Sequence, residues 1–245
     1  MAEVVIALDY PNTKDALALA GKLKGRGLWM KVGMELFTRG GPDIVKTLQD
    51  LDYKIFLDLK FHDIPNTVRG GVESAASLGV GLTTIHLCGG EPMCRAAAEA
   101  QRTHGGKLTV LGVTVLTSLG PADLKAELAA YNLPGCSDFE PFPGEVAMNR
   151  AISAKQWGLR GIVCSPHEIN KIKETCGKNF ICLTPGIRLA GGDVQDQKRI
   201  MTPGEAAKLG SDYLVIGRAI TAADDPEKAC DAVFEDIARL ACSGV

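Results

Sequence analysis

The chain lacks several features that would restrict its function at once. No apolar run approaches the ~20 residues needed to cross a bilayer, and the formal net charge of the 245 residues is only -2. Without a cationic excess, binding to nucleic acid or to an anionic membrane is not indicated. The four histidines are scattered, with no carboxylate–histidine cluster at zinc-ligand spacing. Chemistry on a small molecule is the function class that these absences leave.

Cysteine is present in eight copies, but these show no CxxC pair and no regular metal-ligand spacing. Several lie inside apolar runs such as Ile162–Cys164, where cysteine acts as a small buried hydrophobic residue. The N-terminus leads directly into the apolar run Val4–Leu8, without a basic region followed by a long apolar segment. We therefore expect no secretory signal and a location in the reducing cytoplasm.

The sequence does contain a regular alternation of two hydrophobic patterns. Short apolar runs rich in β-branched residues predict strands at Val4–Leu8, Leu28–Val32, Lys54–Leu59, Leu82–Leu87, Leu108–Val115, Gly161–Cys164, Phe180–Leu183 and Tyr213–Ile216. Helical patterns follow at Thr13–Lys24, Glu35–Gln49, Asn66–Leu78, Glu91–Gln101, Gly144–Trp157, Glu168–Cys176, Thr202–Leu209 and Pro226–Leu240. Such strict alternation is typical of an α/β protein with a parallel sheet.

This alternation predicts a single (β/α)8 TIM barrel, one domain spanning residues 1–245. A doubly wound open sheet is the competing architecture, because a number of strands does not prove closure. That fold usually carries a glycine-rich dinucleotide turn after its first strand, where this chain has Asp9–Asn12. No linker or change in composition divides the chain. We therefore favour the barrel.

Charged residues gather at the predicted carboxyl ends of the strands, where barrel enzymes place their reacting groups. Asp9 follows the first strand and Lys31 lies near the end of the second. Asp58 and Lys60 end the third and, being two apart, point to the same face. Singly, each could be a rim residue or part of a structural ion pair. Together they would be costly to bury, so their convergence indicates a catalytic site rather than a stabilising one.

Two segments near the C-terminal end of the chain indicate a phosphate site. The predicted eighth strand runs into Gly217 and Arg218, where glycine allows close backbone approach and arginine offers two donors to phosphate oxygens. Barrels often bind phosphate after strands seven and eight. Arg188 and Gln197 lie at the two ends of the loop after strand seven and could close over the anion. A tight turn with a surface arginine and a disordered loop are the alternatives.

The segment Asp58–Thr67 resembles the signature of the orotidine 5′-phosphate decarboxylase family, which catalyses the last step of de novo UMP synthesis. Shorter matches to the bacterial type extend over nearly the whole chain, at Leu8–Asp9, Lys31–Gly33, Thr184–Arg188, Asp196–Pro203 and Val215–Arg218. The central segment is highly specific, whereas the shorter matches would be ambiguous alone.

The resemblance implies roles for the matching residues toward orotidine 5′-monophosphate (OMP). Lys60 would protonate C6 as CO2 leaves, Asp58 would lie against the substrate carboxylate, and Lys31 and Asp9 would contact the ribose and hold the charged array. Asp63 would complete the catalytic set with Lys60, Asp58 and Lys31. The other implied substrate contacts are Thr117 at the pyrimidine, Arg188, Gln197, Gly217 and Arg218 at the phosphate, and Ile64, Thr67 and Pro185 within the matching segments.

The resemblance also implies a homodimer, because Asp63 and Thr67 would reach into the neighbouring subunit's site. It implies no metal and no other cofactor. Related sugar-phosphate barrels, such as 3-keto-gulonate 6-phosphate decarboxylase or hexulose-phosphate synthase, share an Asp-x-Lys-x-x-Asp strand end and use magnesium; the continuation His62–Thr67 favours the pyrimidine enzyme. A catalytically silent phosphate-binding scaffold is a further alternative, and the complete set of four ionic residues argues against it.

Overall fold

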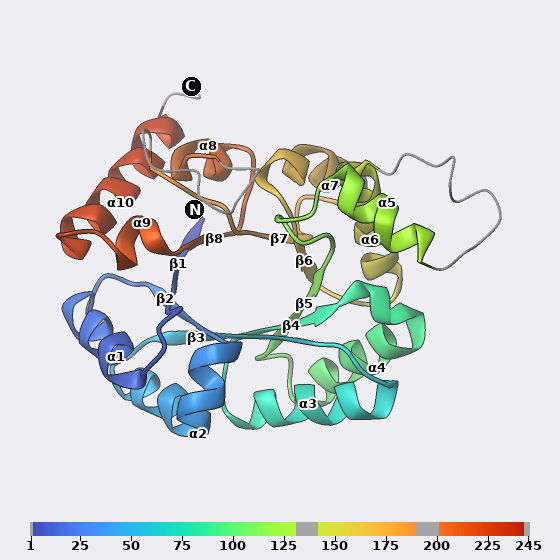
Figure 1. Ribbon diagram of the computed structural model, residues 1–245, viewed down its shortest axis with the longest axis horizontal. Coiled ribbons are helices and arrows are strands. Elements are labelled where there is room, and N and C mark those ends of the chain that lie inside the picture. Colours follow the sequence, from blue (N-terminus) through green and yellow to red (C-terminus); the bar gives the residue numbers. More distant parts are fainter. Residues whose placement is uncertain (1, 131–141, 190–200, 243–245) are drawn as a thin grey trace.

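The strands form a closed parallel barrel in chain order, and β1 pairs with β8 to complete the ring (Figure 1). The computed structural model describes residues 2–130, 142–189 and 201–242. The strands are β1 (Glu3–Ala7), β2 (Trp29–Gly33), β3 (Lys54–Phe61), β4 (Leu82–His86), β5 (Thr109–Val113), β6 (Gly161–Val163), β7 (Ile181–Thr184) and β8 (Tyr213–Ile216). The predicted TIM barrel is confirmed, and the β1–β8 pairing excludes the open sheet.

Helices surround the barrel as an outer ring (Figure 1). They are α1 (Thr13–Lys22), α2 (Met34–Asp50), α3 (Pro65–Ser77), α4 (Gly90–Thr103), α5 (Pro121–Ala129), α6 (Pro143–Gln156), α7 (Ile169–Cys176), α8 (Pro203–Lys208), α9 (Arg218–Thr221) and α10 (Pro226–Cys242), with the short 3-10 turns η1 (Leu87–Gly89) and η3 (Pro166–Glu168). In α3, Val68, Val72 and Ala75 are buried, as their helical spacing predicts. No helix in the described part of the chain is long and apolar enough to cross a membrane.

The helix predicted at Glu35–Gln49 is bent rather than continuous. Gly41 has a φ of 55°, and Pro42 follows it within α2. Proline has no backbone N–H and its ring clashes with the carbonyl four residues earlier, so a helix cannot run straight through it. Glycine is the residue that adopts a positive φ without strain.

The barrel interior is a small apolar core, separate from the larger one between strands and helices. Its buried residues are Val5, Ala7, Trp29, Phe56, Leu82, Leu111, Leu183 and Val215. At the amino end of the strands, the Trp29 indole Nε1 donates to the Glu3 carboxylate at 2.7 Å. The Trp29 ring packs edge-on against Tyr213 at 5.4 Å, and the Lys54 ammonium lies 5.2 Å from its centroid. Large side chains therefore close this end of the barrel.

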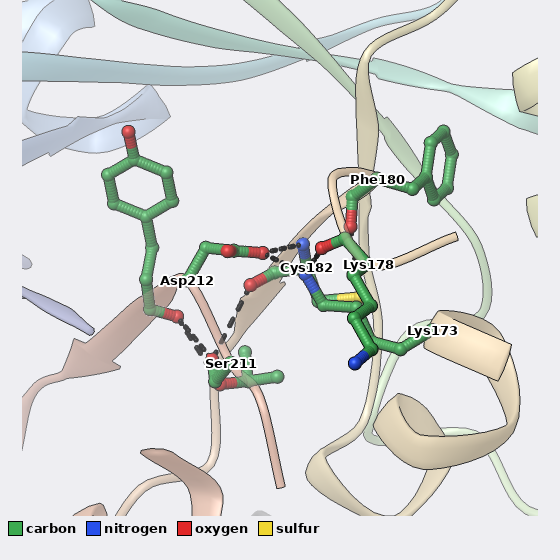
Figure 2. Close-up of polar contacts among 8 residues, drawn as sticks. Lys173, Lys178, Phe180, Cys182, Ser211 and Asp212 are labelled. Carbon is green, nitrogen blue, oxygen red and sulfur yellow. Dashed lines mark hydrogen bonds and ion pairs between the residues drawn. The ribbon is translucent and has the colours of Figure 1, made fainter. Parts of the chain in front are cut away.

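At the amino end of the barrel, hydrogen bonds and an ion pair connect separate segments of the chain (Figure 2). The Asp212 carboxylate accepts from the Lys173 ammonium and from the backbone N–H of Cys182, both at 2.7 Å. The Ser211 hydroxyl lies 2.6 Å from that of Thr184. A hollow of about 580 Å³ is lined in part by Lys173, Ser211 and Asp212. Within it, the contacts of Asp212 with Lys173 and with the N–H of Cys182 connect α7, β7 and the start of β8. We interpret this end as stabilising the fold.

The cysteines whose side chains the structure describes are free thiols, and all except Cys88 are buried: Cys88, Cys94, Cys164, Cys176, Cys182 and Cys230. Burial raises the pKa of the Cys94 thiol to about 12. The prediction that cysteine serves mainly as a small buried apolar residue is confirmed for the five buried positions and does not hold for the exposed Cys88.

Candidate active site

A cavity of about 510 Å³ lies at the carboxyl ends of the strands. This volume is within the range of small-molecule sites. Its apolar wall includes residues of the barrel interior and of the loop after β5: Ala7, Phe56, Val113, Val115, Leu116, Val163, Leu183 and Val215. The remaining lining includes most of the predicted site: Asp9, Lys31, Asp58, Lys60, Thr117, Pro185, Arg188, Gly217 and Arg218. The cavity thus has one apolar side and two charged groups of residues.

The first charged group is a chain of alternating sign. The Lys60 ammonium lies 2.7 Å from one Asp58 oxygen, and the Lys31 ammonium lies 3.8 Å from the same oxygen. Lys31 in turn lies 2.7 Å from the Asp9 carboxylate. The predicted convergence of these four residues is confirmed. Lys31 and Asp58 are each only 8% exposed, so the centre of the cluster is shielded from water.

The environment of Asp58 keeps it ionised. Burial by itself raises the pKa of this carboxyl, but the charges of Lys31 and Lys60 and the hydrogen bonds from Lys60 and Thr84 outweigh burial and lower the pKa below its ordinary value. A fixed negative charge therefore lies beside the Lys60 ammonium at neutral pH.

Gly33 leaves the room that the Lys31–Asp9 pair occupies. A Cβ at Gly33 would lie 3.1 Å from the Lys31 Nζ and 3.3 Å from the Asp9 Oδ1. Both contacts are shorter than ordinary van der Waals separations, so a Cβ here would require the Lys31 and Asp9 side chains to shift by a few tenths of an ångström. Glycine at the end of β2 is thus part of how the sequence builds the cluster.

The backbone beneath Lys60 departs from an ordinary strand. Lys60 has a φ of 51°, and the pairing of β3 with β4 shifts register between Leu57 and Phe61. Strand alternation correctly placed Asp58 and Lys60 on one side, but it did not predict this irregularity. Left-handed backbone at a lysine is unfavourable, and such strain is concentrated at functional sites.

The second charged group that lines the cavity is a pair of arginines, Arg188 and Arg218. Arg188 is buried, and its Nη1 donates to the Ile187 carbonyl at 2.9 Å. Burial, and then the charge of Arg218, lower the pKa of the Arg188 guanidinium. Gly217 exposes backbone to the cavity directly before Arg218. Two neighbouring cations beside open backbone form an arrangement suited to a multiply charged anion.

The flanks of the loop after β7 are joined to each other. The Arg188 backbone N–H donates to the Met201 carbonyl at 3.0 Å, and the Met201 N–H donates to the Gly186 carbonyl at 3.3 Å. Gln197 and most of the loop predicted to cover the phosphate, residues 190–200, lie outside the described residues. The two described flanks of the loop therefore meet at Arg188, one of the two arginines that line the cavity.

Three predicted residues do not line the cavity of their own chain. Asp63, Ile64 and Thr67 are exposed, in the connection after β3 and the first turn of α3. The side chain of Ile64 is 67% exposed, and further large apolar residues, Met34, Leu116 and Phe142, are exposed as well. The Asp63 carboxylate accepts the N–H of Ile64 at 2.6 Å. These three residues are therefore not part of the cavity as a single chain forms it.

The histidines nearest the cluster are not among the residues that line the cavity. The rings of His62 and His86 lie 5.9 Å apart, and burial followed by the charge of His62 lowers the pKa of His86. Over residues 2–130, 142–189 and 201–242, no three His, Cys, Asp or Glu side chains are grouped so that they could hold a metal ion.

Sequence reasoning missed the apolar wall and the buried hydroxyl of Thr84. Phe56 could have been found, because it lies two residues before Asp58 on the same face of β3. The hydrogen bonds of Thr84 depend on the register of β3 against β4, for which the sequence carries no local signal.

The fold and the site together define a TIM-barrel protein with an ion cluster and an arginine pair at the carboxyl end of its strands. Residues 2–233 match the model of the orotidine 5′-phosphate decarboxylase / HUMPS family, and the chain belongs to this family. The family predicted from Asp58–Thr67 is thereby confirmed.

Curated relatives match over nearly their whole lengths. An orotidine 5′-phosphate decarboxylase of Nitratidesulfovibrio vulgaris is 49% identical over 245 residues, which cover 98% of this chain and 99% of the relative. One from Legionella pneumophila is 45% identical over 236 residues, covering 96% and 99%. A crystal structure of the orotidine 5′-phosphate decarboxylase from Lactobacillus acidophilus has a TM-score of 0.82 at 37% identity, with 97% of this chain and 99% of that chain covered.

Proposed function

We propose that the protein decarboxylates OMP to UMP and CO2, the final step of de novo pyrimidine synthesis. The observation that carries this proposal is the alternating cluster Asp9–Lys31–Asp58–Lys60 at the wall of a closed-barrel cavity, with the Lys60 ammonium 2.7 Å from Asp58. Full-length relatives named orotidine 5′-phosphate decarboxylase, at 44–49% identity, support it further.

In this proposal, Lys60 supplies the positive charge and the proton that the decarboxylation requires. Loss of CO2 from C6 leaves an electron pair on a vinyl carbon that the pyrimidine ring cannot delocalise. A fixed cation beside this carbon stabilises the developing charge, and this term is large in a site that excludes water. The same ammonium then gives its proton to C6, so that the C6–carboxyl bond is replaced by a C6–H bond and Lys60 is left neutral until it regains a proton. No metal or organic cofactor takes part.

Asp58 holds Lys60 and faces the substrate carboxylate. Because its carboxyl stays ionised, it disfavours the negatively charged substrate group more than the neutral CO2 that leaves. This is destabilisation of the ground state. Its positional role stands on the ion pair alone, since Asp58 fixes the ammonium from which the proton comes. In the proposed complex, Lys31 and Asp9 contact the ribose, and Thr117 and Pro185 contact the pyrimidine.

Arg188, Arg218 and the backbone at Gly217 bind the phosphate in this proposal, with Gln197 contributing from the loop. The mutual repulsion of the two arginines is relieved when a dianion lies between them, which makes phosphate binding favourable. The phosphate is far from the reacting carbon, so its binding energy is available to hold the ring against Lys60.

The active unit is a homodimer with shared sites. Asp63 and Thr67 reach the neighbouring subunit's site, and Ile64 contributes to substrate binding from the same segment. The exposure of these residues, with the apolar Ile64 67% exposed, supports a second chain at this surface. The free, buried thiols of the protein suit a reducing compartment. We therefore place the enzyme in the cytoplasm.

The family also includes sugar-phosphate enzymes, so the substrate is the point to test. The decisive assay follows the loss of OMP absorbance with purified protein in EDTA, alongside 3-keto-gulonate 6-phosphate with and without magnesium. The proposal expects OMP turnover that EDTA leaves unchanged. Turnover of the sugar phosphate alone, dependent on magnesium, would assign the related reaction. Binding of UMP without turnover of either substrate would instead indicate a silent scaffold.

A further inference from the structure

The side chain of Thr84 joins two catalytic residues without lining the cavity. Thr84 lies in β4 and is 0% exposed. Its hydroxyl oxygen lies 2.8 Å from the Asp58 Oδ1 and 3.0 Å from the Lys60 backbone nitrogen. The Lys60 ammonium binds the other oxygen of the same carboxylate, Oδ2. Both oxygens of Asp58 are therefore held, one by the ammonium and one by a buried hydroxyl.

The direction of each hydrogen bond is fixed by the chemistry of the partners. An ionised carboxylate can only accept, and a backbone N–H can only donate. The single proton of the Thr84 hydroxyl therefore goes to Asp58, and a lone pair of its oxygen receives the N–H of Lys60. The donor capacity and one acceptor site of this hydroxyl are both used within the cluster, so an apolar side chain such as valine would leave both partners without this contact.

The irregular backbone explains why the Lys60 N–H needs this partner. Leu57 pairs with Thr83, and the next pair joins Phe61 to Ile85. Over this interval β3 advances four residues while β4 advances two, so the regular ladder is interrupted at the catalytic residues. The left-handed conformation of Lys60 lies within the same interval. Thr84 takes the N–H that the interrupted ladder leaves, and thus supports a conformation that a lysine rarely adopts.

We propose that Thr84 is a positioning residue for the decarboxylation: its one hydroxyl orients the Asp58 carboxylate and holds the backbone that directs Lys60 into the cavity. The inference rests on the proposed function and deepens it, because it concerns the same site. Thr84 is not a catalytic residue, since it does not line the cavity that receives the substrate.

Thr84→Val tests this directly, because valine keeps the shape and removes the hydroxyl. We expect kcat for OMP to fall about 100-fold, the scale of a small misplacement of reacting groups. The dissociation constant of UMP should change less than about threefold, because the arginine pair and Gly217 are untouched. Thr84→Ser keeps the hydroxyl and should recover most of kcat.

The matched control is Thr83→Val, one residue away. Thr83 is also 0% exposed, and its hydroxyl donates to the Leu57 carbonyl at 2.9 Å, outside the cluster. This variant loses a buried hydroxyl as well, so it measures the general effect of such a loss on folding, and its kcat should stay within about threefold of wild type. Equal kcat losses in the two valine variants would reduce Thr84 to a structural role and overturn the inference.

Two further outcomes keep the test decisive. If Thr84→Val does not fold, Thr84→Cys is the substitute, because cysteine has a similar size and a weaker donor. A kcat equal to that of wild type in this variant would overturn the inference. A loss of kcat of about tenfold or more, with unchanged UMP binding, would support it. Failure of the proposed function is recognised separately, because wild-type protein would then not convert OMP at all.

Discussion

The two ends of the barrel contain the same kind of ion pair and use it differently. At the amino end the Lys173 ammonium lies 2.7 Å from Asp212, and at the carboxyl end that of Lys60 lies 2.7 Å from Asp58. Asp212 also accepts a backbone N–H of β7 and so joins chain segments to one another. Asp58 lies within a chain of alternating charges beside a cavity. A short lysine–aspartate distance therefore does not identify a catalytic pair; its surroundings do.

The backbone of Lys60 also sets the carboxyl-end pair apart, because neither Lys173 nor Asp212 is among the described residues with positive φ. Of the two described non-glycine residues with positive φ, Asp52 lies in the turn before β3, where an aspartate is readily accepted, and Lys60 lies within β3 itself. Left-handed backbone at a residue such as lysine costs about 1–2 kcal/mol. The fold accepts this cost at a residue that lines the cavity and belongs to the ion cluster.

Lys60→Ala should produce the largest effect and the sharpest contrast between the two ends. Loss of both the stabilising cation and the proton donor should lower kcat for OMP by about 10⁴-fold or more, while UMP binding persists. Lys173→Ala, which removes the matching lysine at the amino end, should leave kcat near that of wild type and lower the Tm. Steady-state kinetics and thermal unfolding of both variants check this, and a near-normal kcat for Lys60→Ala would remove that residue from its role.

Arg218→Ala should weaken capture of the phosphorylated substrate. Loss of a charged hydrogen bond of roughly 1.5–3 kcal/mol predicts a fall in kcat/KM for OMP of about 10- to 100-fold. Arg160→Ala is the control, because Arg160 contacts the Gly106 carbonyl away from the cavity. An unchanged kcat/KM in Arg218→Ala would show that the phosphate binds elsewhere.

Mixed dimers should show whether the carboxyl end is completed by a second chain. Lys60→Ala and Asp63→Ala subunits, each inactive alone, should together regain about a quarter of wild-type activity, since half of randomly paired dimers contain one intact site of two. Lys60→Ala mixed with Asp58→Ala should regain none, because both residues belong to one chain's site. Absence of activity in verified Lys60→Ala/Asp63→Ala heterodimers would argue for self-contained sites.

The smallest expected effect is on stability as the pH changes. The pKa of Asp58 is lower in the folded protein than its ordinary value, so the ionised carboxylate stabilises the fold above about pH 4. This stabilisation is lost as the pH falls through the folded-state pKa. The Tm of wild type minus that of Asp58→Asn should therefore be constant near neutral pH. It should decrease as the pH falls into the acid range, because protonation of Asp58 removes the stabilisation that its charge provides. A difference independent of pH down to pH values near about 3 would contradict the assigned charge state.

Much of this architecture could be predicted because its signals are local. Each strand was read from a run of apolar residues, and Asp9, Lys31, Asp58 and Lys60 were brought together simply by being at strand ends in a barrel. The conformation of Lys60 could not be predicted in this way, because it accompanies a register shift between β3 and β4 and a hydrogen bond to a hydroxyl of another strand.

Two other features show the same limit. The bend of α2 at Gly41 follows from a Gly-Pro step that the helical periodicity of the segment obscured. The roles proposed for Asp63 and Thr67 involve a second chain, so neither the sequence pattern nor a single subunit can determine them. Local patterns thus placed the residues, and the contacts between elements determine their geometry.

The most direct test of the account is a crystal structure of the complex with 6-hydroxy-UMP, whose negatively charged 6-oxygen stands in for the carbanion at C6. The account predicts that oxygen within hydrogen-bonding distance of the Lys60 ammonium and the phosphate against Arg188 and Arg218. A nucleotide bound with C6 turned away from Lys60, or with its phosphate outside the arginine pair, would contradict it.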